Sequence, residues 1–280
     1  MDTLVTTEWL ERHLDDADLV VLDCTVYQQD DGEGGFRNVS GRARHEQAHI
    51  PGAGFADLKG DLADPASPIE FDLPAPEAFC TAMGTLGVGD DSRVVLYDAS
   101  YSAWAARVWW MLRWVGFDRA ALLDGGLGAW IDEQRPLETG PVSSVKQHLT
   151  PSVRPRLIAD RDEVLASIGD GAVCLIDTLP AEMYRGEATI YARPGHIPGA
   201  VNAPGPDLFD ETGHFRRNDE LAGVVAGDRG ARNITYCGGG ILASANAFVM
   251  TRLGFEDVAV YTASLQEWAA DPENPLVTEK

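Results

Sequence analysis

Short β-branched apolar runs alternate along this chain with longer amphipathic stretches. The alternation is typical of α/β domains in which helices flank a mostly parallel sheet. One helix start is well marked, because Asp160 stands as a candidate N-cap and Glu163 follows three residues later. The runs that predict strands are 20–22, 94–97 and 122–123 in the first half, and 173–176, 234–236 and 258–261 in the second.

The two halves repeat one another. The motif His-Ile-Pro-Gly-Ala at 49–53 recurs at 196–200, and the run that ends at Asp98 aligns with the run that ends at Cys237. A length of 280 residues exceeds the usual single domain of about 100–200 residues. We therefore predict two tandem α/β domains, at 1–139 and 156–280. The proline-containing stretch 140–155 would be the linker.

Charge and composition exclude some classes of binding partner. The formal net charge of −22, without any Lys/Arg-rich run, argues against binding to nucleic acid or an anionic membrane. No apolar stretch approaches the roughly 18–20 residues of a membrane span, and the first residues do not resemble a secretion signal. We expect a cytoplasmic protein. The four scattered cysteines suggest neither a disulfide scaffold nor a zinc site.

Cys237 is the candidate for covalent chemistry. It follows the predicted strand 234–236 and precedes three glycines and a predicted helix at 243–250. Ligands of open α/β sheets bind beyond the carboxyl ends of the strands, which is where Cys237 stands. The glycines allow a loop whose N–H groups point inward, and N–H groups at a helix N-terminus favour negative charge. The setting predicts a thiolate that can also form a persulfide, with no metal or organic cofactor.

Other chemically suggestive residues are interpreted as structural. Cys24, Cys80 and Cys174 lack a comparable loop and are expected to be inert buried residues. His49 and His196 recur in both halves, so we expect both to serve as hydrogen-bonding positions in turns.

These features resemble the tandem-domain rhodanese and 3-mercaptopyruvate sulfurtransferase family over essentially the whole chain. The resemblance implies two rhodanese-like domains, the first catalytically silent because Asp98 stands at the position of Cys237. It also implies that sulfane sulfur moves from thiosulfate or 3-mercaptopyruvate to a thiol, cyanide or protein acceptor through a Cys237 persulfide. Backbone N–H groups would bind the persulfide, at Gly238, Gly239, Gly240, Ile241 and Leu242. The segments that carry the resemblance are the repeated His-Ile-Pro-Gly-Ala, 106–112, 123–127, 184–186, the Cys237 loop and 267–268.

The loop departs from the family pattern. Thiosulfate-specific members carry basic residues directly after the cysteine, and this loop has none, so it is closer to the mercaptopyruvate type. That type usually has Ser or Thr at the position of Gly239, and a proton relay with an acidic residue and a histidine. Lys59 and Phe71 stand at the places of those two relay residues. The choice between the two donors therefore stays open.

Recognition of the donor by arginine is only partly matched. In mercaptopyruvate enzymes an arginine pair binds the donor carboxylate, but here Met183 precedes Tyr184. Arg185 and Arg193 are the nearby candidates, because a planar, permanently charged guanidinium suits a carboxylate or sulfonate. A salt bridge or a solvated surface charge is the alternative interpretation of both.

Two other function classes are compatible with parts of this pattern. A phosphatase with a related cysteine loop needs arginine at the sixth position after the cysteine, and that position is Ala243. A noncatalytic persulfide carrier or binding module, fed by a protein donor, stays open. Turnover of a small donor would separate an enzyme from a carrier, because an enzyme follows ping-pong kinetics and a carrier transfers sulfur only stoichiometrically.

Overall fold

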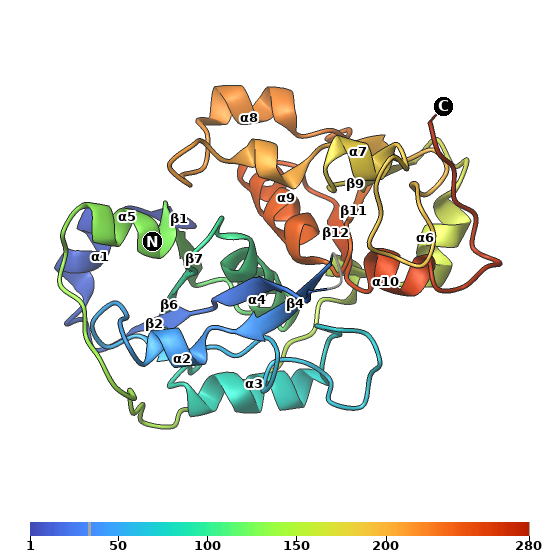
Figure 1. Cartoon of the computed structure of the whole chain (residues 1–280). Helices are drawn as coiled ribbons and strands as arrows, with labels where there is room; N and C mark the ends of the chain where they lie inside the picture. The colour runs from blue at the N-terminus through green and yellow to red at the C-terminus, as the bar shows by residue number, and fades with distance from the viewer. Residues whose placement is uncertain (33–34, 280) are drawn as a thin grey trace. The chain divides into compact units, whose positions relative to one another are not determined.

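The computed structural model describes residues 1–32 and 35–279, which form two compact units (Figure 1). The first unit comprises 1–66, 73–154 and 211–215. The second comprises 67–72, 155–210 and the chain from Arg216 on. Each unit thus includes a short segment from the other half of the sequence.

A five-stranded parallel sheet forms the first unit, in the order β5-β2-β6-β7-β1, with a separate antiparallel pair, β3 and β4. The strands are β1 Leu4–Val5, β2 Leu19–Asp23, β3 Val26–Asp30, β4 Phe36–Ser40, β5 Gly54–Phe55, β6 Arg93–Tyr97 and β7 Ala120–Leu123. The helices are α1 Thr7–His13, α2 Arg42–His45, α3 Pro76–Thr85, α4 Ala103–Trp114 and α5 Gly126–Asp132.

The sheet of the second unit has the same architecture, in the order β10-β9-β11-β12-β8, and all its pairs are parallel. The strands are β8 Ile158–Ala159, β9 Val173–Asp177, β10 Val201–Asn202, β11 Arg232–Tyr236 and β12 Val258–Tyr261. The helices are α6 Arg161–Ser167, α7 Ala181–Tyr184, α8 Asn218–Val224, α9 Ile241–Arg252 and α10 Ser264–Trp268, with 3₁₀ turns η1 Pro155–Leu157 and η2 Gly205–Leu208.

The central strands β6 and β11 are deeply buried, as are their neighbours β7 and β12. Four of the five residues in each central strand are buried, because parallel sheets are covered by helices on both faces. Helix α9 packs against both β11 and β12, and Figure 1 shows it running beside these strands. Burial on both sides explains the apolar run 94–97 in β6, whereas β11 also buries Asn233 and Thr235, whose side chains donate to backbone carbonyls.

The repeated His-Ile-Pro-Gly-Ala motif has the same structural role in both units. The backbone N–H of Ile50 donates to the Tyr97 hydroxyl (3.3 Å), and that of Ile197 donates to the Tyr236 hydroxyl (3.0 Å). These tyrosines end β6 and β11, the strands that precede Asp98 and Cys237. The motif therefore fixes the carboxyl end of each central strand.

The predicted α/β class with mostly parallel sheets is confirmed, and all six predicted strands are present with extensions of at most two residues at either end. Asp160 is the N-cap of α6, and its carboxylate accepts a hydrogen bond from Glu163 N–H (2.8 Å). Within the described residues, no helix has the length and apolar character needed to cross a membrane.

Candidate active site

Cys237 follows the central strand β11 directly, and α9 begins four residues later at Ile241. Its side chain is buried, with the residue only 3% exposed. Gly240 caps α9 with φ 78°, a left-handed conformation that glycine adopts without the steric cost of a Cβ. The strand, loop and helix predicted from sequence are all present, with α9 two residues longer at each end than predicted.

The loop presents a row of unpaired peptide donors. Among the described residues, none accepts a hydrogen bond from the backbone N–H groups of 238–242. The last two of these N–H groups open α9, a helix of 12 residues whose N-terminus carries partial positive charge. Such a row of N–H groups favours an anion at the position of the cysteine sulfur.

A turn from β12 to α10 supports the loop from the other side. The Ser264 hydroxyl accepts a hydrogen bond from the Cys237 N–H (3.1 Å) and donates to the Tyr261 carbonyl (2.6 Å). The Cys237 carbonyl accepts from Leu265 N–H (3.1 Å), and the Gly238 carbonyl accepts from Gln266 N–H (3.0 Å). Ser264 is fully buried with φ 53°, a conformation that is rare for serine. The turn fixes both peptide groups of Cys237.

Two side chains that the sequence reasoning missed lie against the glycines. A Cβ atom at Gly238 would overlap the Tyr191 hydroxyl, and one at Gly239 would collide with Gln266 Nε2. The adjacent pair Glu267-Trp268 was part of the family resemblance, so Gln266 had a weak sequence signal. Tyr191 had no signal, because the stretch from 188 to 200 has no regular secondary structure.

The two arginines proposed from sequence are engaged elsewhere. The Arg193 guanidinium donates to four backbone carbonyls between residues 268 and 274, at 2.5–3.1 Å. Arg185 forms a two-point ion pair with Glu187 (2.7 and 2.9 Å) at a partly exposed position. Arg193 therefore ties down the C-terminal segment, and Arg185 makes a surface pair. Of the sequence candidates, the structure brings together Cys237 and residues 238–242.

The remaining cysteines are poor nucleophiles. Burial raises the pKa of Cys24 well above its usual value and that of Cys80 to about 11, and it also raises the pKa of Cys174. None of the three follows a strand into a glycine loop and a helix. Their thiols stay protonated at neutral pH, so thiolate chemistry is not expected there.

The two repeated histidines bond to backbone. Nδ1 of His49 is 2.7 Å from the His45 carbonyl, and Nδ1 of His196 is 2.7 Å from the Tyr184 carbonyl. Each histidine backbone also bridges to a distant segment, at Glu138 and Val277 respectively. These contacts agree with a hydrogen-bonding role in turns.

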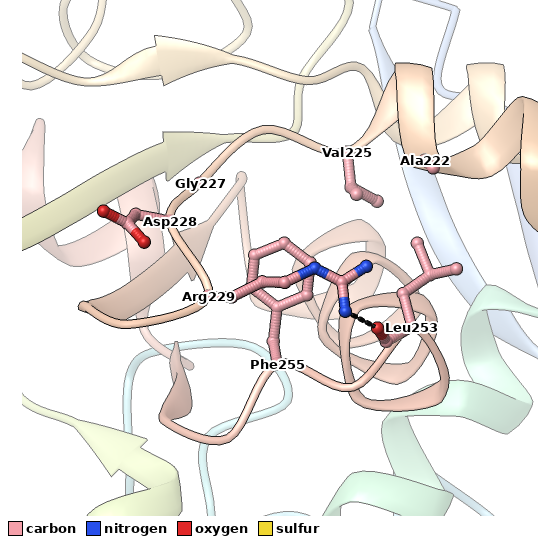
Figure 2. Close-up of a pocket in the computed structure, with 7 residues that line it drawn as sticks. All are labelled: Ala222, Val225, Gly227, Asp228, Arg229, Leu253 and Phe255. Atoms are coloured by element: carbon pink, nitrogen blue, oxygen red, sulfur yellow. Dashed lines mark hydrogen bonds between the residues drawn. The ribbon is translucent and has the colours of Figure 1, made fainter.

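A surface cavity of about 510 Å³ lies elsewhere in the second unit (Figure 2). Figure 2 shows Arg229 crossing the Phe255 ring, with its guanidinium bonded to the Leu253 carbonyl. Leu253 follows the C-terminal end of α9, whereas Cys237 precedes its N-terminal end. A helix of 12 residues is about 18 Å long, so the cavity is remote from the cysteine loop.

The first unit has a carboxylate where the second has the cysteine. Asp98 Oδ1 accepts hydrogen bonds from the N–H groups of Ser100 (2.8 Å) and Ser102 (3.0 Å), and Oδ2 accepts from Ala105 N–H (3.0 Å). Asp98 is fully buried, and burial raises its pKa despite these N–H bonds. The loop N–H groups of the first unit are thus paired within the protein.

The second unit therefore has the features of an α/β protein that carries a covalent intermediate on a thiol: a buried cysteine after the central parallel strand, a glycine loop and unpaired N–H groups at a helix start. Comparison with known proteins gives the family. Residues 6–133 and 160–271 both match the Rhodanese-like domain, and the chain belongs to that family.

Relatives match over nearly the whole length. The chain is 31% identical to the 3-mercaptopyruvate sulfurtransferase of Escherichia coli K12, over 97% of this chain and 96% of the relative. It is 30% identical to the thiosulfate sulfurtransferase of Gallus gallus, over 95% and 92% of the two chains. The crystal structure of the Escherichia coli 3-mercaptopyruvate sulfotransferase SseA superposes with a TM-score of 0.83 at 30% identity, covering 94% of this chain and 99% of that chain.

Proposed function

We propose that this protein is a sulfurtransferase that carries sulfane sulfur as a persulfide on Cys237. The observation that carries the proposal is the run of unpaired N–H groups at 238–242, beside a buried cysteine at the start of α9. In the first unit, by contrast, Asp98 accepts hydrogen bonds from the N–H groups of Ser100, Ser102 and Ala105. The enzyme class also agrees with the sulfurtransferases to which the chain is similar.

The first half-reaction loads the cysteine. The Cys237 thiolate attacks the outer sulfur of thiosulfate or the thiol sulfur of 3-mercaptopyruvate, and a new S–S bond forms as the bond from that sulfur to the rest of the donor breaks. Thiosulfate releases sulfite, which leaves with the bonding electron pair. 3-Mercaptopyruvate releases the enolate of pyruvate, whose carbon keeps the bonding electron pair of the C–S bond and takes up a proton to give pyruvate. Backbone N–H groups of 238–242 stabilise the negative charge on sulfur in this step.

The second half-reaction unloads it. A thiolate or cyanide attacks the outer sulfur of the persulfide, the S–S bond breaks, and the Cys237 thiolate returns. The row of N–H groups stabilises the departing thiolate as it stabilised the persulfide. Both donors are retained in the proposal, because the relatives include a mercaptopyruvate enzyme and a thiosulfate enzyme.

We assign the catalytic domain to 156–280 and a catalytically silent domain to 1–139, with 140–155 as the linker. Asp98 supports the silent assignment, because a buried carboxylate that accepts N–H bonds cannot act as a sulfur nucleophile. Residues 67–72 cluster with the second unit and residues 211–215 with the first, so two short segments depart from these boundaries.

Intact-protein mass spectrometry tests the proposal. The full chain is incubated with thiosulfate or with 3-mercaptopyruvate, desalted and weighed, and then treated with cyanide. We expect a gain of one sulfur atom that cyanide removes, and no gain in Cys237→Ser. A gain that persists in Cys237→Ser would overturn the assignment of the cysteine. Absence of any gain with both donors would favour the carrier fed by a protein donor.

A further inference from the structure

Tyr191 closes over the first glycine of the loop. Its hydroxyl occupies the space that a side chain at Gly238 would need. Burial raises the pKa of Tyr191, and the nearby charge of Cys237 raises it further, so the hydroxyl keeps its proton at working pH. Among the described residues, no acceptor is hydrogen bonded to this hydroxyl. Tyr191 thus presents a permanent, neutral donor beside the cysteine loop.

Gln266 does the same at the second glycine. Its Nε2 lies where a side chain at Gly239 would project. The orientation of the amide is fixed, because Oε1 accepts a hydrogen bond from the Glu70 N–H (3.0 Å) and only the NH₂ end can then face the glycine. The Gln266 N–H bonds to the Gly238 carbonyl (3.0 Å), which fixes the backbone as well. No described residue accepts a hydrogen bond from Nε2.

Both donors belong to the second unit, which includes Glu70 through the segment 67–72. The two arginines that the sequence suggested for donor binding form other contacts. Arg193 donates to four backbone carbonyls, and Arg185 pairs with Glu187. The loop itself is neutral. Hydrogen-bond donors without charge are therefore the side-chain groups that the structure places against residues 238 and 239.

We propose that the Tyr191 hydroxyl and the Gln266 amide form a neutral clamp that binds the oxyanion end, carboxylate or sulfonate, of the sulfur donor at the Cys237 loop. This inference rests on the proposed function of Cys237 and adds how the donor is recognised. The clamp would perform the role for which Arg185 and Arg193 were the candidates from sequence, which is binding of the donor's carboxylate or sulfonate. It holds the donor by directional hydrogen bonds while the backbone N–H groups receive the sulfur.

Single-turnover loading of Tyr191→Phe is the first test. The rate of sulfur gain is measured by mass spectrometry against the concentration of whichever donor loads the wild-type protein. We expect the half-saturating concentration to rise about tenfold or more, since one hydrogen bond to an anion is lost, with the maximal rate changed by less than about threefold. Alkylation of Cys237 by the neutral reagent iodoacetamide should keep its rate and pH profile.

Tyr184→Phe is the matched control. It also removes one tyrosine hydroxyl from the second unit, where that hydroxyl donates to the Ala200 carbonyl (2.8 Å). We expect lower thermal stability and an unchanged half-saturating concentration. If Tyr191→Phe instead leaves the half-saturating concentration unchanged, or slows alkylation and maximal loading together, the clamp is overturned.

Gln266 is tested by two independent changes. Gln266→Met keeps the length of the side chain and removes the donor. Gly239→Ala keeps Gln266 but adds a methyl group that would push its amide away from the loop. Both should raise the half-saturating concentration, and the double variant should be no worse than Gln266→Met alone, because one donor is lost in either case. If the two substitutions raised the half-saturating concentration additively, they would not both act by removing the Gln266 donor. If wild type gains no sulfur at all, the proposed function fails first, and that result is distinct from failure of the clamp.

Discussion

The loops Asp98–Ser102 and Cys237–Gly240 follow equivalent central strands and lead into equivalent helices, α4 and α9. In the first loop a buried carboxylate accepts the N–H groups of Ser100, Ser102 and Ala105. In the second loop a thiol stands at the start, and the N–H groups of 238–242 are unpaired among the described residues. One arrangement uses the N–H groups for stability, and the other keeps them available for chemistry.

The largest expected effect comes from Cys237→Ser. A hydroxyl cannot form a persulfide, so sulfur transfer should fall by at least about a thousandfold, while the melting temperature changes little because the side chain keeps its size. Turnover assays with cyanide and thermal melts would measure the two quantities. Residual transfer near the wild-type rate would place the chemistry elsewhere.

Asp98→Ala should show the opposite pattern. It leaves three buried N–H groups without their acceptor, and each orphaned donor costs about 1–3 kcal/mol, partly offset because a buried carboxylate is itself unfavourable. We expect a loss of roughly 3 kcal/mol in the free energy of unfolding, measured by urea denaturation. Transfer per folded molecule should stay close to wild type. Loss of transfer in the folded fraction would mean that the first loop takes part in catalysis.

Asp23 and Asp177 end β2 and β9, the strands beside the central strand in each sheet, but they have different partners. Asp23 lies 3.1 Å from His45 Nδ1 and accepts from the Thr25 N–H and hydroxyl. The corresponding Asp177, which is fully buried, accepts a hydrogen bond from Leu179 N–H (2.8 Å). Burial raises the pKa of Asp177 to about 7, above its usual value near 3.8.

Asp177→Asn tests the raised pKa of Asp177 through the pH dependence of the free energy of unfolding. A raised pKa means that the folded state binds a proton that the unfolded state has lost, so wild-type stability should fall as pH rises from about 4 through 7 and then level off. Asparagine mimics the neutral acid and has no such dependence. Relative to the variant, wild type should lose roughly 2–3 kcal/mol between pH 5 and 8. Parallel stability curves for the two proteins would exclude a raised pKa.

The smallest effect is expected at the helix caps. Ser102 and Gly240 cap α4 and α9 with φ 54° and 78°, and only glycine adopts this conformation freely. The buried Ser102 hydroxyl also has no hydrogen-bond partner among the described residues. Ser102→Gly should therefore stabilise the protein by about 1 kcal/mol, visible as a small rise in melting temperature. Gly240→Ser should lower it, and no change in either variant would argue against strain at this cap.

Sequence reasoning captured the parts of the molecule that depend on local pattern. The six apolar runs, the Asp160 cap and the Cys237 loop were all readable because strands, caps and glycine turns leave short-range signals. The pairing of Arg193 with distant carbonyls and the approach of Tyr191 to Gly238 were not readable. Both join a segment without regular structure to residues more than 40 positions away, and such contacts leave no periodicity.

The segment 67–72 affects whether the second half of the sequence can be produced separately with its site intact. Glu70 lies in the first half of the sequence, yet its N–H fixes the amide of Gln266 in the second unit. A gene cut within 140–155 would yield a C-terminal fragment with the cysteine, the glycines and α9, but without the peptide group that orients this glutamine. The second unit therefore depends on a peptide group that the first half of the sequence supplies.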